Sequence, residues 1–289
     1  MGRFLNLIGV CLFAFNIGAQ DLEILKVQYS YLPNGQIADS TIADEKIDFS
    51  EYTISVLLPA IMGDKFHLLA GGTFNLAFPQ SANNEANTKL YFMGLRFIGA
   101  YDLNEKNRLI ATWVPSISST LEDDLSGDDF LTQASISYSR LATDSLRYGF
   151  GVMYTSRFGF PQALPLLTCS YLRAKVRYDI RLPISIRATW DYDAKFSYGL
   201  KLSVNGSQFN ASQGAIYEGV PIDAVNFSRI LLGPEFGIRL KEKLYLTLFA
   251  GVSLRRIFEL KSENDLDQNL SLDNGLFFSA KISLKPNQN

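Results

Sequence analysis

Apolar residues alternate with polar or small residues over long stretches of this chain. Every second position of residues 244–254 is apolar, and the positions between include Thr247, Gly251 and Ser253. The same alternation runs through residues 134–138. Because successive side chains of a strand point to opposite faces, a period of two predicts β-strands with one apolar face and one polar face.

Such strands occur in soluble β-sandwiches and in membrane barrels, and three features favour the barrel. The predicted strands run to 11–14 residues, whereas strands of soluble sheets usually have about five or six. Short connections such as 63–65 alternate with long ones such as 210–225, and the polar face repeatedly carries Arg, Lys and Gly. Aromatic residues such as Tyr101 and Trp190 lie at strand ends, where interfacial rings of a membrane protein are found. The pattern therefore predicts an all-β protein, a transmembrane antiparallel up-and-down β-barrel.

The number of strands depends on residues 165–191, which keep one apolar phase throughout. As a single strand this stretch would measure on the order of 90 Å at about 3.4 Å per residue, too long for a bilayer. Three short strands with a turn at Pro183 give an even total of fourteen and place both termini on the periplasmic side. Twelve strands is the alternative. The fourteen predicted strands are 22–32, 47–58, 66–78, 88–101, 108–118, 129–141, 146–158, 165–172, 175–182, 184–191, 196–208, 226–240, 244–260 and 274–285.

The N-terminus has the pattern of a secretory signal peptide. Arg3 is followed by the nearly all-apolar segment 4–17 and by the small residues Gly18 and Ala19. We expect cleavage after Ala19, which makes residues 1–19 the signal and residues 20–289 a single barrel domain. No later segment offers the roughly 20 consecutive apolar residues that a membrane-spanning helix needs. The predicted location is the outer membrane, with its lipid bilayer as partner.

Composition agrees with a membrane barrel and argues against several other classes. Hydrophobic residues make up 47% of the chain and charged residues 19%, against about 25% charged in an average soluble protein. The formal net charge of −2 gives no basis for nucleic-acid binding. The single histidine, His67, would have to serve any Ser-His-Asp or zinc site, and its neighbours on the same strand face are Leu69 and Gly71. We expect no enzyme activity, no catalytic residue, no cofactor and no metal site.

An acidic stretch between two predicted strands is the one candidate for a cation site. It contains Glu122, Asp123, Asp124, Asp128 and Asp129. The spacing does not fit an EF-hand, and runs of like charge usually solvate a loop. We therefore expect a solvated loop, with surface calcium binding as the minor alternative.

The charged side chains on the inward face carry the functional hypothesis. Bases outnumber acids there, and buried charges need water or an ion-pair partner. A basic-leaning lumen favours a passive pore or solute-uptake channel. A salt-bridged, plugged interior would instead fit a non-conducting structural or surface-binding barrel, and a membrane hydrolase is a distant third. The predicted lumen-lining residues are Glu51, Arg96, Arg147, Arg157, Arg173, Lys175, Arg177, Asp179, Arg181, Arg187, Asp191, Lys201, Arg229, Glu235, Arg239 and Arg255.

The chain also resembles uncharacterised outer-membrane β-barrel proteins of Gram-negative bacteria. The signal that ends at Ala19-Gln20, together with the barrel pattern, carries the general likeness. Residues 182–190 and 195–209 are similar to one barrel family of unknown function. The resemblance implies an outer-membrane barrel that the cellular barrel-insertion machinery assembles. It assigns no functional residue.

Overall fold

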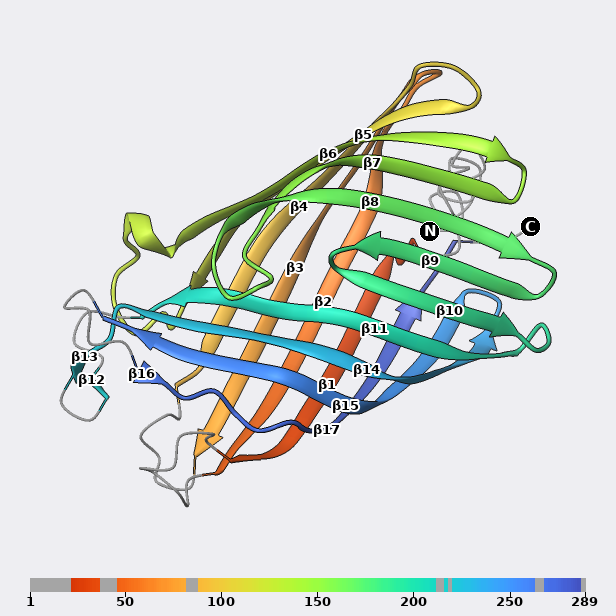
Figure 1. Ribbon diagram of the computed structural model, residues 1–289. Coiled ribbons are helices and arrows are strands. Elements are labelled where there is room, and N and C mark those ends of the chain that lie inside the picture. Colours follow the sequence, from red (N-terminus) through yellow and green to blue (C-terminus); the bar gives the residue numbers. More distant parts are fainter. Residues whose placement is uncertain are drawn as a thin grey trace.

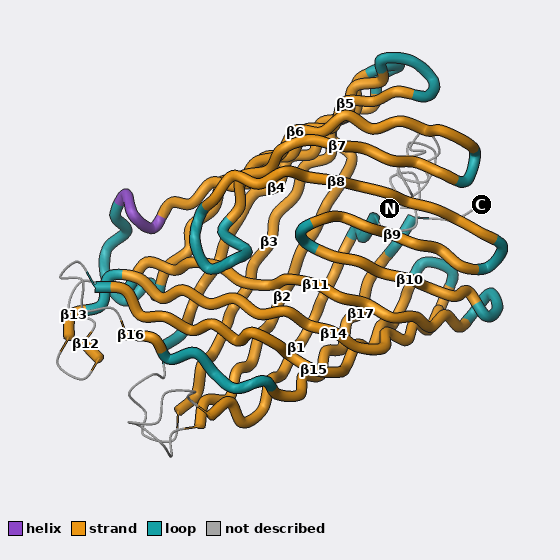
Figure 2. Tube along the Cα trace, viewed as in Figure 1, coloured by secondary structure: helices purple, strands orange, loops and turns teal. Residues whose placement is uncertain are grey.

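The computed structural model describes residues 22–36, 46–81, 88–211, 216–217, 220–262 and 268–286, and nearly all of them are in strands (Figures 1 and 2). The predicted signal peptide lies outside the described residues. The long strands are β1 (Leu25–Gln36), β2 (Lys46–Met62), β3 (Phe66–Ser81), β4 (Leu90–Asp102), β5 (Asn107–Ser119), β6 (Phe130–Thr143), β7 (Leu146–Thr155), β8 (Gln162–Arg173), β9 (Val176–Leu182), β10 (Ser185–Asp191), β11 (Phe196–Asn210), β14 (Ala224–Lys241), β15 (Leu244–Lys261) and β17 (Gly275–Leu284). The short elements are η3 (Gly127–Asp129), β12 (Ile216–Tyr217), β13 (Val220–Pro221) and β16 (Gln268–Asn269).

The long strands form one closed antiparallel barrel. Each pairs with the next long strand along the chain, and β1 pairs with β17 from Leu25–Leu284 to Tyr31–Phe278. This ring of fourteen strands confirms the predicted fold class and strand number. Tight turns join the strands at the end where both termini of the described chain lie, which we call the short-turn end; the opposite end is the long-loop end (Figure 1). No helix in the described part of the chain is long and apolar enough to cross a membrane.

The ambiguous stretch 165–191 does fold as three strands, of which β8 has twelve residues and β9 and β10 have seven each. β8, β9 and β10 pair in order, and the turn between β9 and β10 contains Pro183. The β9–β10 hairpin stops well before the long-loop end, as Figure 1 shows. Most strand boundaries differ from the prediction by one to four residues. Around the β7–β8 loop, β7 ends at Thr155 rather than at 158 and β8 begins at Gln162 rather than at 165.

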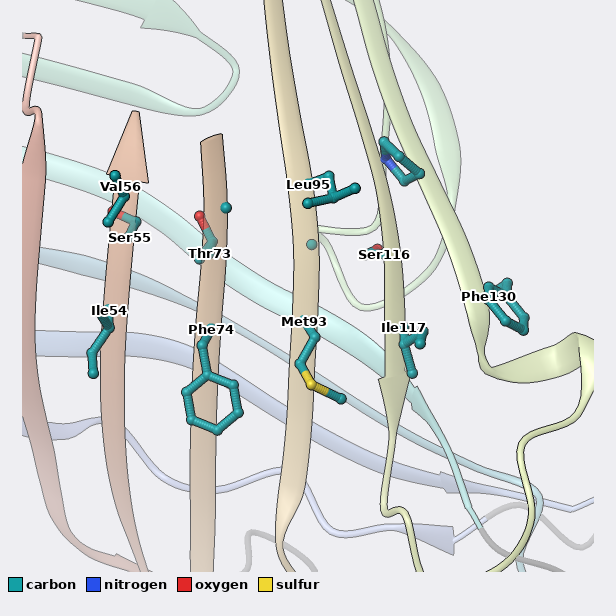
Figure 3. A pocket seen from close by; sticks show the side chains of 13 residues that line it. Ile54, Ser55, Val56, Thr73, Phe74, Met93, Leu95, Ser116, Ile117 and Phe130 are labelled. Carbon is teal, nitrogen blue, oxygen red and sulfur yellow. The ribbon is translucent and has the colours of Figure 1, made fainter. Parts of the chain in front are cut away.

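The outward face is apolar over most of the wall, as the alternation predicts. Ile136 at the middle of β6 is 55% exposed, and Leu200 and Phe236 are similarly exposed on β11 and β14. A shallow hollow in this face lies beside Gly72, between Ile54 and Met93 (Figure 3). Apolar side chains form most of its lining, so the hollow belongs to the membrane-facing surface.

The barrel narrows toward the long-loop end because two strands that are distant in the wall meet there. Asn210 at the end of β11 pairs in parallel with Ser119 at the end of β5, and the hydroxyl of Ser118 donates a hydrogen bond of 2.5 Å to the carbonyl oxygen of Gln208. This contact closes a smaller ring, the nine-strand ring, which leaves β6 to β10 outside. Its members are β1, β2, β3, β4, β5, β11, β14, β15 and β17.

Apolar side chains fill the nine-strand ring. The rings of Phe49 and Phe227 meet edge to face at 4.9 Å, and those of Phe209 and Phe227 stack at 5.7 Å. Phe249 and Phe277 make a further contact at 4.6 Å. All five rings belong to one buried cluster. The lumen is therefore closed by a packed core at the long-loop end, whereas the sequence pattern had predicted a polar interior throughout.

Candidate functional site

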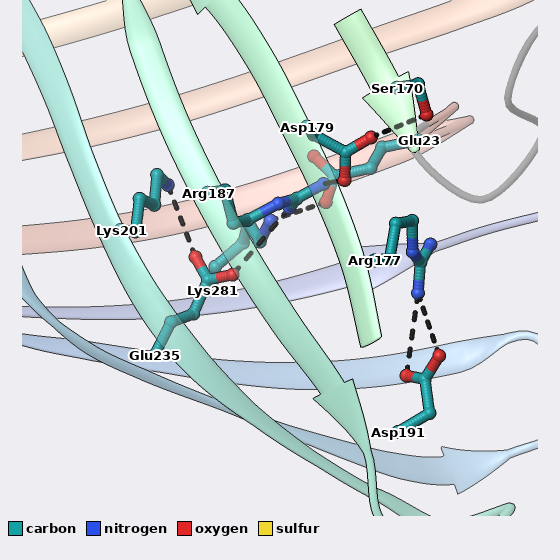
Figure 4. A network of polar contacts seen from close by, with 9 residues as sticks. All are labelled: Glu23, Ser170, Arg177, Asp179, Arg187, Asp191, Lys201, Glu235 and Lys281. Atoms are coloured by element: carbon teal, nitrogen blue, oxygen red, sulfur yellow. Dashed lines mark hydrogen bonds and ion pairs between the residues drawn. The ribbon is translucent and has the colours of Figure 1, made fainter. Parts of the chain in front are cut away.

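The lumen toward the short-turn end is lined by ion pairs along β9, β10, β11 and β14 (Figure 4). Arg187 Nη2 lies 3.2 Å from Asp179 Oδ2, and Arg187 Nη1 lies 3.7 Å from Glu235 Oε1. Lys201 Nζ lies 3.3 Å from the other oxygen of Glu235. Arg187 is paired in register with both Asp179 and Lys201, so period-two phasing alone places these charges side by side.

A second pair continues this surface toward the turns. Arg177 Nη2 lies 3.1 Å from Asp191 Oδ2. We call Arg177, Asp179, Arg187, Asp191, Lys201 and Glu235 the polar wall. Sequence reasoning had placed all six in the lumen. Among the pairs it missed is Glu23 with Lys281 at 2.5 Å, because Glu23 precedes β1 and its position depends on how the chain enters the barrel.

Glu51 and Arg229 mark the border between the polar wall and the packed core. They form an ion pair although β2 and β14 are not neighbours in the sheet. The guanidinium carbon of Arg229 also lies 5.0 Å from the ring centre of Phe49 and 5.2 Å from that of Phe227. Both charges thus lie in the lumen, as predicted, but they connect opposite walls rather than line an open channel.

Two predicted lumen residues lie elsewhere. Arg255 occupies a β-bulge with φ +48° and is exposed, and the inward position passes to Arg256, which is 4% exposed. A bulge adds one residue to one strand and so reverses the phase beyond it. Lys175 lies in the exposed β8–β9 turn, where its ammonium donates a 3.2 Å hydrogen bond to the carbonyl oxygen of Tyr192.

The other predicted basic residues have either a hydroxyl partner instead of a carboxylate, or no partner among the described residues. Arg239 Nε donates to the Tyr245 hydroxyl at 2.9 Å, and Arg147 Nη1 makes a 3.5 Å contact to the Ser139 hydroxyl. Arg173 is exposed at the short-turn end. Arg96 and Arg181 occupy inward positions of β4 and β9, whereas Arg157 lies in the β7–β8 loop rather than in a strand.

His67 has a charged neighbour that its own strand does not reveal. Its Nε2 lies 3.1 Å from Asp102 Oδ2, and the same carboxylate accepts hydrogen bonds from Nε and Nη2 of Arg108. Leu69 and Gly71 are its neighbours on its own strand, but β3 pairs His67 with Ala100 and so brings Asp102 of β4 next to it on the same face. His67 is 3% exposed. His67, Asp102 and Arg108 thus form one charged cluster near the short-turn end of the wall.

The acidic β5–β6 loop is organised by hydrogen bonds within the protein. Asp129 is buried and accepts bonds from the Ser126 amide at 2.6 Å and from the Asn210 side chain at 3.1 Å. Burial raises the pKa of Asp129, and hydrogen bonds from Ser119, Ser126 and Asn210 lower it by more, so its pKa lies below the ordinary value. In the part of the chain that the structure describes, no three His, Cys, Asp or Glu side chains gather as metal ligands.

Comparisons with known proteins address the family and the fold. A family model described as "Domain of unknown function (DUF6268)" matches residues 69–285. No curated protein matches the chain.

Solved structures similar to the chain are membrane barrels. The translocator domain of the autotransporter NalP from Neisseria meningitidis is 11% identical, with a TM-score of 0.40, and the match covers 98% of this chain and 94% of that one. The monoaromatic hydrocarbon channel TodX, as a deletion mutant, is 8% identical over 97% of this chain and 94% of that one, with a TM-score of 0.44. A FadL homologue of Pseudomonas aeruginosa is 9% identical over 96% and 92%, with a TM-score of 0.37. Likenesses this distant say nothing about what the chain binds.

Proposed function

The chain belongs to the family described as Domain of unknown function (DUF6268), and we propose that it is an outer-membrane solute-uptake channel with an anion-favouring lumen. The observation that carries this proposal is the division of the lumen into two zones. One zone is a polar, partly accessible wall of charged residues toward the short-turn end. The other is the apolar core of the nine-strand ring.

The membrane setting follows from the outward face. Exposed Ile, Leu, Val and Phe side chains surround the barrel, and exposed rings such as Tyr101, Trp190 and Tyr192 lie near its short-turn end. Such a surface suits a bilayer with aromatic side chains at the interface. Export through the signal at residues 1–19 and assembly by the barrel-insertion machinery complete the proposal.

The balance of charge supports anions over cations. Each carboxylate of the polar wall is matched by a base, so the wall as a whole is close to neutral. Arg96, Arg157 and Arg181 have no carboxylate within ion-pair distance among the described residues and leave a net positive charge in the lumen. Basic side chains in a pore favour anions. No catalytic step is part of the proposed function.

A non-conducting structural barrel is the second candidate, and the packed core favours it. Phe49, Phe209 and Phe227 leave no straight path along the axis of the nine-strand ring. In that case the ion pairs would serve stability alone.

Current through planar lipid bilayers separates the two candidates. Purified protein that migrates faster unboiled than boiled on a gel is a closed barrel, and only such protein is added to the bilayer. We expect discrete current steps with long closed intervals, and no steps from boiled protein. An absence of steps from correctly folded protein would support the non-conducting barrel.

A further inference from the structure

The outward face of β11 and β14 changes character near the long-loop end. Toward the short turns it carries exposed Leu200 and Phe236, whereas farther along it carries Gly206 and Gln208 on β11 and Asn226 and Ser228 on β14. Gly206 is in register with Ser228, and Gln208 with Asn226. We call these four residues the seam. Polar groups on this face would be costly against lipid, and Asn226 and Ser228 are buried.

The β7–β8 loop, residues 156–161, covers the seam, and we call this loop the lid. The carbonyl oxygen of Arg157 lies 2.6 Å from the place where a Cβ on Gly206 would stand, so the lid backbone fits here only because residue 206 is a glycine. A Cβ on Gly159 would lie 3.9 Å from Ser228 Cβ and 4.0 Å from Asn226 Cβ. The lid therefore rests directly on β11 and β14, outside the nine-strand ring.

The lid lies where the barrel wall is incomplete. β10 pairs with β11 only between Ser185–Ser203 and Asp191–Ser197, so residues 205–210 of β11 have no strand partner on that side until Asn210 meets Ser119. On the other side the wall steps down from β6 to the β9–β10 turn (Figure 1). The lid thus lies where residues 205–209 of β11 have no strand partner on that side.

Polar atoms without partners lie in the lid and on the seam beneath it. Ser156 Oγ and Asn226 Oδ1 are buried and accept or donate no hydrogen bond within the described residues. Buried polar atoms left unpaired are costly. Their presence under the lid suits a route for water and polar solutes, and it does not suit an apolar seal.

Three arginines gather on the lumen side of the lid. Arg157 belongs to the lid itself, Arg181 is the penultimate residue of β9 beside the incomplete wall, and Arg96 points inward from β4. The charges of Arg96 and Arg181 both act on Arg157, and Arg181 acts on Arg96; we call these three residues the basic trio. Lys26 of β1 adds a fourth positive charge that interacts with Arg96 and Arg157. Arg96 Nε has no hydrogen-bond partner among the described residues.

We propose that the basic trio is a binding site for a phosphate group, entered through the seam when the lid lifts. This deepens the proposed channel function and rests on it. Guanidinium groups bind phosphate oxygens in a bidentate manner. Three unpaired positive charges match a doubly charged phosphate better than a singly charged carboxylate or chloride. The polar seam selects a hydrophilic solute over one with an apolar tail.

Binding of inorganic phosphate to detergent-solubilised barrel, measured by calorimetry, tests the site without requiring conduction. We expect Arg157→Gln and Arg181→Gln each to weaken phosphate binding by about tenfold, the size of one charge-assisted bond. Arg173→Gln, at an exposed arginine of the short-turn end, is the matched control and should leave affinity unchanged. Equal affinity of wild type and Arg157→Gln, or no phosphate binding at all, would overturn the site.

A reversible cross-link tests the lid. Gly159→Cys with Ser228→Cys, in a Cys169→Ser background, places two Cβ atoms at about the 3.8 Å typical of disulfides. Because Gly159 has φ +98°, the Gly159→Cys single variant controls for strain at that position. Oxidation should cut the bilayer current and slow phosphate binding at least tenfold, and reduction should restore both.

Phosphate binding and bilayer current together distinguish a failure of the proposed site from a failure of the channel function. If oxidised and reduced proteins conduct equally while Phe209→Ala with Phe227→Ala raises the current, the path runs through the nine-strand ring and the lid proposal is wrong. If phosphate binds under control of the lid but no variant conducts, the site stands and the channel function fails. Dodecyl phosphate binding more tightly than inorganic phosphate would assign the phosphate to a lipid headgroup and contradict the hydrophilic seam.

Discussion

Arg229 on β14 forms an ion pair with Glu51 on β2 across the lumen, and the two strands are separated in the wall by β15, β17 and β1. Arg229 is 5% exposed. Removal of its partner would leave a buried charge without compensation. We expect Glu51→Ala to lower the free energy of unfolding by about 3–5 kcal/mol, the usual effect of breaking a buried pair. Urea unfolding in detergent measures it.

The double variant Glu51→Leu with Arg229→Met is the control for this pair. It removes both charges beside the rings of Phe49 and Phe227, and apolar replacements of a buried pair are often neutral. It should be more stable than Glu51→Ala. If it is less stable, the pair contributes net stability and the border is not apolar in character.

Adjacent residues of β6 test which face meets lipid. Ile136 points outward and Ser137 points inward, opposite Gly151 of β7. Ile136→Arg should lower the free energy of unfolding by about 2–4 kcal/mol if residue 136 lies near the bilayer midplane, and Ser137→Arg should lower it by much less. The yield of folding into lipid vesicles, measured over a series of urea concentrations, compares the two variants. Equal costs would mean that the faces are exchanged.

Two neighbouring glycines of β3 have different spatial requirements. A Cβ on Gly71 would stand 1.9 Å from the carbonyl oxygen of Val56, whereas the nearest atom to a Cβ on Gly72 is at 3.7 Å. Gly71→Ala should therefore destabilise the barrel by about 1–3 kcal/mol through the backbone shift it forces, and Gly72→Ala should be close to neutral. The temperature at which the unboiled gel band is lost compares them.

Asp129 connects the β5–β6 loop to the closure of the nine-strand ring through Asn210. Its pKa is lower in the folded protein than its ordinary value of about 3.9. A lowered folded pKa gives stability that is complete above the ordinary value and is lost as pH falls through the folded value. Proteolysis of the loop should thus rise below about pH 4.

The substitution Asp129→Ala should make loop proteolysis high and independent of acid pH. Asp128→Asn, at an exposed neighbour, is the matched control. A pH response that persists in Asp129→Ala would assign the effect to another group.

Alternation of side chains was sufficient to predict most of the wall. It predicted fourteen strands, three of them within residues 165–191, because period two is a property of each strand alone. The polar wall followed from the same phase, since Asp179, Arg187 and Lys201 occupy inward positions in register.

The alternation of side chains could not predict contacts between strands that are distant in sequence. Nothing in the sequence indicates that Asn210 meets Ser119, and this contact shapes the nine-strand ring and its packed core. The bulge at Arg255 reverses the phase at a single residue, and Asp102 reaches His67 only through the register of β3 with β4. Such features depend on the register and the contacts between strands, and the alternation within one strand carries no information about these.

The reversal potential of the wild-type barrel in a potassium chloride gradient tests the central claim, an anion-favouring lumen set by Arg96, Arg157 and Arg181. The account predicts anion preference in the wild type, loss of that preference in the variant with all three arginines replaced by Gln, and no change in Arg173→Gln. A cation-selective wild type, or a triple variant with unchanged selectivity, would contradict it.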